Sequence, residues 1–209
     1  MDAVSSWNAD SVVARKRINS PMAERQKAQR FEQEIMPHLD SAYNLARWLT
    51  RNDADAQDVV QEACLRAFKY FDGFDGQYAN AWLLKIVRNT CYNWLRANRP
   101  AEEEMALEDN VDAVDQDASA QHLSAQGLGR SPELLASELR DARRINAVID
   151  ELPAANREVI IMREMDELSY REIADITGVP IGTVMSRLAR GRQMLQTGLR
   201  KLGYGAPLS

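Results

Sequence analysis

Apolar residues recur along this chain every three or four positions, which is the spacing of helices that bury one side. In the first half they predict a helix that starts near Arg30 and is disturbed at Pro37. A second helix is expected from Asn52 or Asp53 to about Phe71, and a third from about Asn80 to Ala97. Runs that alternate in the manner of a strand are few, so the pattern predicts an all-α chain.

The second half contains two further helical patterns, within 132–152 and 155–165, followed by a helix-turn-helix pattern over 169–193. Ser169 and Glu172 have the spacing of a capping box, which predicts that a helix begins there. Gly178 suits the left-handed turn that ends it, and Pro180 suits the start of the next helix.

The last predicted helix has two distinct sides. Val184, Leu188 and Leu195 lie on the side that should pack inward. The opposite side carries groups that bind base edges and phosphates, namely Thr183, Ser186, Arg187, Arg190 and Gln193. DNA binding is the interpretation we favour, and a plain helical hairpin with a solvated basic face is the alternative.

These patterns divide the chain into segments. Residues 1–29 are polar without a sustained period, which predicts a disordered extension. We expect a helical domain over 30–100, an acidic linker over 101–130, a second helical domain with the helix-turn-helix over 131–203, and a tail over 204–209.

The net charge of −5 is unusual for a DNA-binding protein, but the acidity is local. Residues 101–128 hold eight acidic residues and no Lys or Arg. Since the whole chain carries −5 and this segment −8, the remaining residues together carry +3. Basic surfaces are therefore compatible with the acidic total.

The second predicted helix carries a leucine among charges. Asp58, Gln61 and Glu62 lie opposite its buried stripe, and Leu65 points the same way. An apolar side chain in such a position indicates a protein partner, although a single exposed leucine is also common on surfaces.

The third predicted helix has a basic polar face formed by Lys85, Arg88, Asn89, Tyr92, Arg96 and Arg99. Basic groups interleaved with amides and an aromatic ring suit contacts with phosphates and unstacked bases. The preceding loop, 74–80, adds aromatic and amide groups. A solvated face on a core helix is the alternative.

Other classes of function find little support. His38 and His122 are too few for a metal site, and we expect no cofactor and no catalytic residue. Cys64 and Cys91 fall in helical patterns and are expected to be reduced core residues. Neither a secretory signal nor a membrane-spanning run is recognisable, which predicts a cytoplasmic protein.

Three segments together resemble a known family: DADAQDVVQEACLRAF, NAWLLKIVRNTCYNWLR and ELPAANREVIIMREMDELSYREIADITGVPIGTVMSRLARGR. In this order they are similar to bacterial RNA polymerase sigma factors of the extracytoplasmic-function (ECF) group. The resemblance covers about 30–100 and 133–202 and leaves the extension and the linker uncovered.

The resemblance implies a role for each surface. Asp58, Gln61, Glu62 and Leu65 would bind the clamp helices of the large subunit of core RNA polymerase. The −10 promoter element would be opened and read by Gln77, Asn80, Arg88, Asn89, Asn93 and Arg96. The −35 element would be read by Thr183, Ser186, Arg187 and Arg190.

The same resemblance implies three partners: core polymerase, promoter DNA and an anti-sigma factor. It also implies a role in a stress or envelope response, and we expect no direct insertion into a membrane. Met185 stands where the family often has lysine, so we assign it no base contact. The acidic linker would thread a basic polymerase channel, or serve as a soluble spacer. The alternative function is a stand-alone regulator that binds duplex DNA without polymerase.

Overall fold

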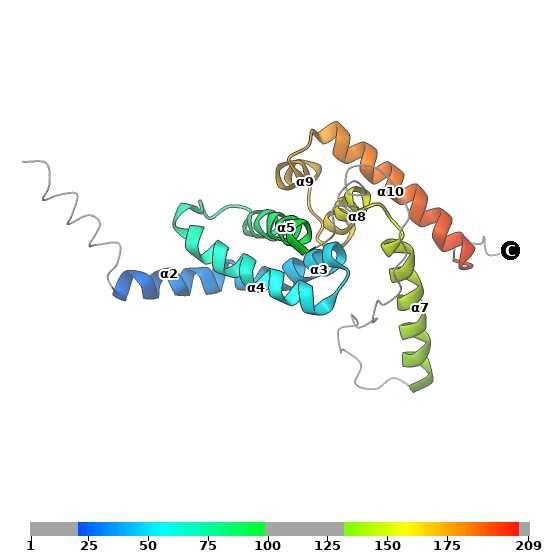
Figure 1. The fold of residues 1–209 in the computed structure, drawn as a ribbon, viewed down its shortest axis with the longest axis horizontal. Helices are drawn as coiled ribbons and strands as arrows, with labels where there is room; N and C mark the ends of the chain where they lie inside the picture. The colour runs from blue at the N-terminus through cyan, green and yellow to red at the C-terminus, as the bar shows by residue number, and fades with distance from the viewer. Residues whose placement is uncertain (1–20, 99–131, 205–209) are drawn as a thin grey trace, which may run out of the picture.

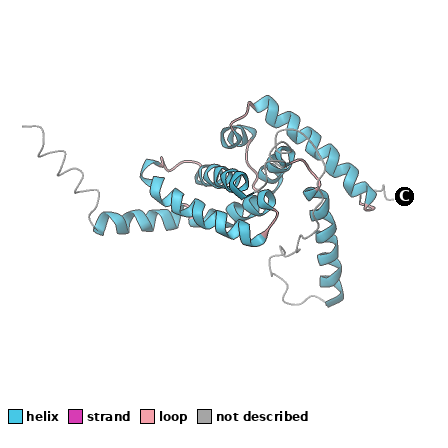
Figure 2. Cartoon of the chain, in the orientation of Figure 1, coloured by secondary structure: helices cyan, strands magenta, loops and turns pink. Residues whose placement is uncertain are grey.

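The computed structural model describes residues 21–98 and 132–204, and within them every regular element is a helix (Figures 1 and 2). The predicted all-α class is therefore confirmed for these residues. The first part of the predicted extension, the acidic linker and the end of the tail lie outside the described residues.

The N-terminal helices form a compact group. They are α2 (Pro21–Glu34), the short 3-10 helix η1 (Met36–His38), α3 (Leu39–Thr50), α4 (Asp53–Tyr70), the 3-10 helix η2 (Phe71–Gly73) and α5 (Ala79–Asn98). Helices α3, α4 and α5 pack against one another and enclose this part of the core.

The predicted disturbance at Pro37 is confirmed, but α2 begins earlier than the sequence pattern indicated. Residues 21–29, assigned above to a disordered extension, are helical. The helix has no clear period there because Phe31 is its only buried residue. It is held instead by Phe31 and by an ion pair, 2.6 Å long, between Lys27 Nζ and the Asp72 carboxylate.

The C-terminal helices are α7 (Pro132–Asp150), α8 (Ala154–Ile160), the π-helical segment η3 (Ile161–Met165), α9 (Tyr170–Thr177) and α10 (Ile181–Lys201). The predicted helix-turn-helix is present as α9 and α10. The Ser169 side chain and Glu172 form the capping box, and Gly178 ends α9 with φ 72°.

Close helix packing positions α10. A Cβ atom at Gly191 would lie 2.8 Å from Ile160 Cγ1, and one at Gly198 would overlap Val148 Cγ1. Glycine at these two positions therefore lets α10 approach α8 and α7 closely. Val184 and Leu188 are buried as predicted, and Leu195 is partly buried against the core.

The two groups of helices share one continuous hydrophobic cluster, and α9 lies against α5 (Figure 1). Arg157 of α8, fully buried, donates from Nη1 to the Trp48 carbonyl of α3 at 2.9 Å. The same guanidinium donates to the carbonyls of Ile149, Asp150 and Leu152. One side chain thus donates hydrogen bonds to the carbonyls at the end of α7 and links that end to α3.

We expect Ser169→Ala to lower the free energy of unfolding by ~1 kcal/mol, since the first turn of α9 loses its side-chain cap. Urea denaturation followed by circular dichroism measures the change. Thr197→Ala removes an exposed hydroxyl from α10 and is the control, with no loss expected. Equal stabilities of the Ser169→Ala and wild-type proteins would contradict the prediction.

Candidate nucleic-acid interface

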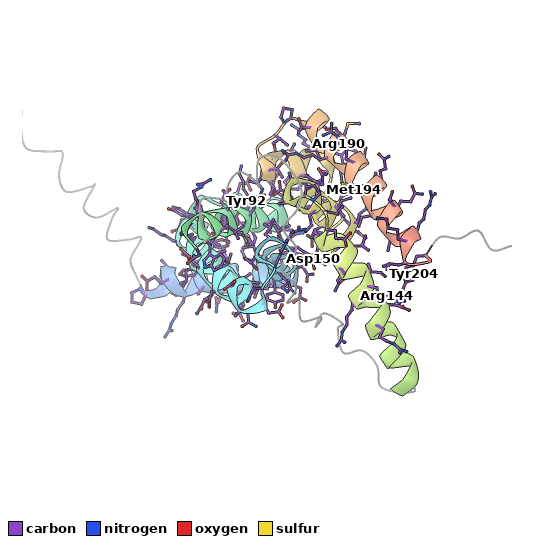
Figure 3. All side chains as sticks on the ribbon, turned by 45° about the vertical axis from the view of Figure 1, so that its right-hand side comes forward. Tyr92, Arg144, Asp150, Arg190, Met194 and Tyr204 are labelled. Carbon is purple, nitrogen blue, oxygen red and sulfur yellow. The ribbon has the colours of Figure 1, made fainter. Side chains whose placement is uncertain are left out.

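The helix-turn-helix presents part of its predicted contact face to solvent. Ser186 and Arg190 are exposed, and Ser186 Oγ donates to the Thr183 carbonyl at 2.9 Å. Thr183 and Arg187 are half-buried. Figure 3 labels Arg190 on α10.

Two apolar side chains accompany these polar groups at the start of α10. Met185 is 54% exposed and Ile181 is 46% exposed. In helix-turn-helix proteins the first residues of the second helix contact base edges. The first turns of α10, which would face base edges, are therefore partly apolar.

On α5 the predicted polar face is divided. Asn89 and Arg96 are exposed, as the helical pattern indicated, and Asn93, which only the resemblance named, is exposed too. Arg88 and Tyr92 are half-buried, because the C-terminal helices cover this part of the face. The helical pattern had predicted that Arg88 and Tyr92 lie on the solvent-exposed side of the helix.

The group that covers Arg88 is the carboxylate of Glu158 in α8, which is 1% exposed. Arg88 donates to it twice, from Nε at 2.8 Å and from Nη2 at 3.1 Å. The Tyr92 hydroxyl donates a third hydrogen bond at 3.0 Å. Arg187 Nη1 lies 3.6 Å from the same carboxylate. We call these four residues the Glu158 cluster.

The Glu158 cluster raises the pKa of Arg88 and of Tyr92. Burial acts to lower the pKa of Arg88, but the hydrogen bonds and negative charge of Glu158 raise it overall. Burial, and then the charge of Glu158, raises the pKa of Tyr92. Both groups therefore keep their protons, and the guanidinium lies 4.5 Å above the Tyr92 ring.

The loop before α5 differs from the prediction in one respect. Gln77 is exposed and Asn80 half-buried, as a contact role allows. Phe74, however, is buried and stacks on Phe71, so it is not available to a base. The aromatic side chain that this loop exposes is Tyr78, which has φ 52°.

The predicted partner face on α4 is an exposed surface. Asp58, Gln61 and Glu62 are exposed, and Leu65 is 68% exposed. Phe68 and Tyr70, further along α4, are exposed as well, at 38% and 60%.

Two carboxylates lie where the two groups of helices meet. Burial raises the pKa of Asp166 to about 6, while a hydrogen bond with Ser41 of α3 acts in the opposite direction. Burial also raises the pKa of Asp150, against the charges of Arg157, Arg51 and Arg47. Each has one carboxylate oxygen without a hydrogen-bond partner.

Within residues 21–98 and 132–204, no cluster of three His, Cys, Asp or Glu side chains is arranged to hold a metal. No helix of these residues is long and apolar enough to cross a membrane.

An all-helical chain with a helix-turn-helix and a second polar helix face is typical of a transcription factor. The chain matches the family models of Sigma-70 region 2 over residues 35–100 and Sigma-70, region 4 over residues 142–195. It is 37% identical over 161 residues to the ECF RNA polymerase sigma-E factor of Haemophilus influenzae, covering 76% of this chain and 80% of that protein.

A second relative is the ECF RNA polymerase sigma factor SigW of Bacillus subtilis, 32% identical over 79% of this chain and 86% of that protein. Among solved structures, the chain is similar to the sigma factor RpoE in complex with the anti-sigma factor NepR from Bartonella quintana. The TM-score is 0.62 at 29% identity, with 81% of this chain and 96% of that chain covered. The chain therefore belongs to the ECF RNA polymerase sigma factor family.

We expect Asp166→Asn to stabilise the protein at pH 7.5 by about 1 kcal/mol, an amount reduced for the partial exposure of the carboxylate. The folded-state pKa is raised, so its contribution is fully present below about pH 4 and is lost as the pH rises through about 6. Denaturation midpoints from pH 4 to 7.5 should show a flatter profile for the variant. Asp175→Asn, at an exposed position of α9, is the control. An unchanged pH profile in Asp166→Asn would be evidence against this assignment.

Proposed function

We propose that this sigma factor binds core RNA polymerase through the exposed face of α4. Asp58, Gln61 and Glu62 supply charge and amide groups, and Leu65 supplies the central apolar contact with the clamp helices of the large subunit. The exposure of Leu65, with Phe68 and Tyr70 nearby on the chain, supports this role. An apolar surface rimmed by polar groups is typical of a protein interface.

The −10 element is opened and read by α5 and the loop before it. The non-template strand lies along Asn89, Asn93 and Arg96, with Arg88 joining when it is accessible, and an unstacked base is held near Gln77 and Asn80. Flipping a base costs a few kcal/mol, and stacking on an aromatic ring returns ~1–3 kcal/mol. The exposed ring of Tyr78 supports this arrangement.

The −35 element is read by α10 in the major groove, through Thr183, Ser186, Arg187 and Arg190. Hydroxyl and guanidinium groups at the start of such a helix meet base edges and phosphates. Two DNA-reading units, about 30–100 and 131–203, thus act on one promoter. In this proposal the protein catalyses no reaction, because the energy of binding drives the melting of promoter DNA. It acts in the cytoplasm, where polymerase and promoter are.

An anti-sigma factor is the further partner in this proposal. The neighbour from Bartonella quintana was solved with one, and the chain covers 96% of that structure. A role in a stress or envelope response is part of the same proposal and rests on the likeness to the ECF group. For the acidic segment 101–130, which lies outside the described residues, the proposal is that it occupies a basic channel of the polymerase, with a soluble spacer as the alternative.

The observation that carries the proposal is that one chain presents a helix-turn-helix and an exposed apolar face on α4. A regulator that binds duplex DNA without polymerase has no use for the second surface. Run-off transcription on a promoter library, with and without core polymerase, separates the two. Promoter-dependent transcripts support the sigma role, whereas tight duplex binding without core and without transcripts would favour the regulator.

We expect Arg187→Ala to weaken use of the −35 element by ~1–3 kcal/mol, with the loss confined to promoters that carry the preferred base. Initiation rates on promoters that vary only in the −35 element measure this. Arg200→Ala removes an exposed arginine in the last turn of α10 and is the control. Equal losses on all promoter sequences would mark Arg187 as a phosphate contact instead.

We expect Leu65→Ala to weaken binding to core polymerase by more than tenfold, because truncating a central interface residue removes 1.4 kcal/mol or more. Surface plasmon resonance on immobilised core measures the affinity. Since Leu65 is exposed, the free energy of unfolding should not change. Met36→Ala, at an exposed apolar residue of η1, is the control. Wild-type affinity of Leu65→Ala would exclude α4 as the main contact.

A further inference from the structure

The exposed side of α10 carries an apolar row beside a polar one. Ile181, Met185 and Ala189 are four positions apart, so they follow one another along the same side of the helix. All three are exposed, Ile181 at 46% and Met185 at 54%. Ser186 and Arg190, also four positions apart and exposed, form the neighbouring polar row. Helix α10 runs along the outside of the C-terminal helices (Figure 1), so a partner can approach both rows.

The apolar row begins at the end of α10 that would enter the major groove. In helix-turn-helix proteins the first residues of the second helix contact base edges, and α10 begins at Ile181. Gly182, three positions before Met185, is a neighbour of Met185 on the helix surface. A Cβ atom at Gly182 would meet no other atom within 4 Å. Packing within the protein therefore does not require glycine there, and its missing side chain leaves space beside Met185 for a ligand.

An apolar side chain in the major groove has a specific ligand, the C5-methyl group of thymine. The other groups that the base pairs present there are hydrogen-bond donors and acceptors, and a thioether is only a weak acceptor. The flexible side chain of Met185 fits an apolar group of irregular position well. None of the 21 residues of α10 is acidic and five are basic, which favours DNA over a protein surface as the occupant.

We propose that Met185 determines specificity for the −35 element: it selects thymine at one position of that element by contact with the C5-methyl group. Ile181 extends the apolar contact. Four residues span about 6 Å along a helix, close to two base-pair steps of about 3.4 Å each. Ile181 therefore meets a base pair one or two steps from the one that Met185 reads. The inference rests on the proposed role of α10 in reading the −35 element, and it adds a base preference that hydrogen bonds do not produce.

The first test removes the methyl group from the DNA. Holoenzyme, made from the full chain and core RNA polymerase, selects its preferred −35 element from a promoter library. Each thymine of that element is then replaced, one at a time, by deoxyuridine, which keeps the base pairing and the O4 acceptor but lacks the C5-methyl group. We expect at least one replacement to weaken binding of the holoenzyme about threefold to fivefold, the effect of one methyl group that is no longer buried. Competition with a fluorescent promoter duplex measures the affinity.

The second test changes the protein. Met185→Ala should bind the thymine promoter and the sensitive deoxyuridine promoter equally well. Met185→Gln keeps the length of the side chain and should lose the response to the methyl group in the same way. It should also shift the preference toward adenine, which glutamine binds through two hydrogen bonds. Since Met185 is exposed, the free energy of unfolding should not change in either variant.

Met165→Ala is the matched control. Met165 of η3 is 51% exposed, close to the value for Met185, but it does not belong to α10. This variant should keep the full response to the methyl group. A gain-of-methyl comparison uses cytosine and 5-methylcytosine at the sensitive position. The wild type should bind the methylated promoter about threefold more tightly, and Met185→Ala should bind both equally.

Three results would overturn the proposal. One is a selected −35 element in which no thymine responds to deoxyuridine. Another is a methyl effect of the same size in Met185→Ala as in the wild type. The third is an equal loss for Met185→Ala on every −35 sequence, which would mark Met185 as a contact with protein.

Failure of the proposed function is recognised separately. If the −35 sequence has no influence on binding of the wild-type holoenzyme, α10 does not read that element. If the −35 sequence matters and the preference responds to Arg187→Ala but not to the methyl group, the role of α10 stands. In that case only the inference about Met185 is wrong.

Discussion

Two adjacent charged residues, both fully buried, determine how the halves of this protein meet. Arg157 and Glu158 of α8 are each 1% exposed. A buried charge is tolerated only where hydrogen bonds and an opposite charge replace water. Arg157 finds carbonyls of α3 and α7, and Glu158 finds Arg88 and Tyr92 of α5. Removing one partner of such a pair costs roughly 3–5 kcal/mol, so the orientation of α8 is strongly constrained.

Local signals predicted much of the fold because their physical causes are local. The capping box at Ser169 acts within three residues, and the left-handed turn needs only Gly178. Asn52 caps α4 through its side chain, as its position before the helical pattern indicated. Helix ends with such signals were predicted within about two residues.

Other features depend on contacts that no local pattern contains. Arg88 and Glu158 are 70 positions apart, so periodicity placed Arg88 on an open face. The start of α2 has too few buried residues to show a period, and Lys27 is 45 positions from Asp72, its partner in the ion pair. Phe68 lies at the edge of the core, where its ring contacts Phe31 and stays 38% exposed, and its place in the helical pattern does not show this. In each case tertiary packing decides what the helical wheel leaves open.

Arg88 contacts Glu158 and is also proposed to contact DNA, and this combination limits how the promoter preference of the protein can evolve. A substitution there would remove the contact with DNA that we propose for Arg88. It would also leave the buried carboxylate of Glu158 without its nearest cation. Asn89 and Asn93 carry no such structural obligation to Glu158 and are exposed. Divergence toward new promoters is therefore expected first at positions 89 and 93, while 88 and 158 change only together.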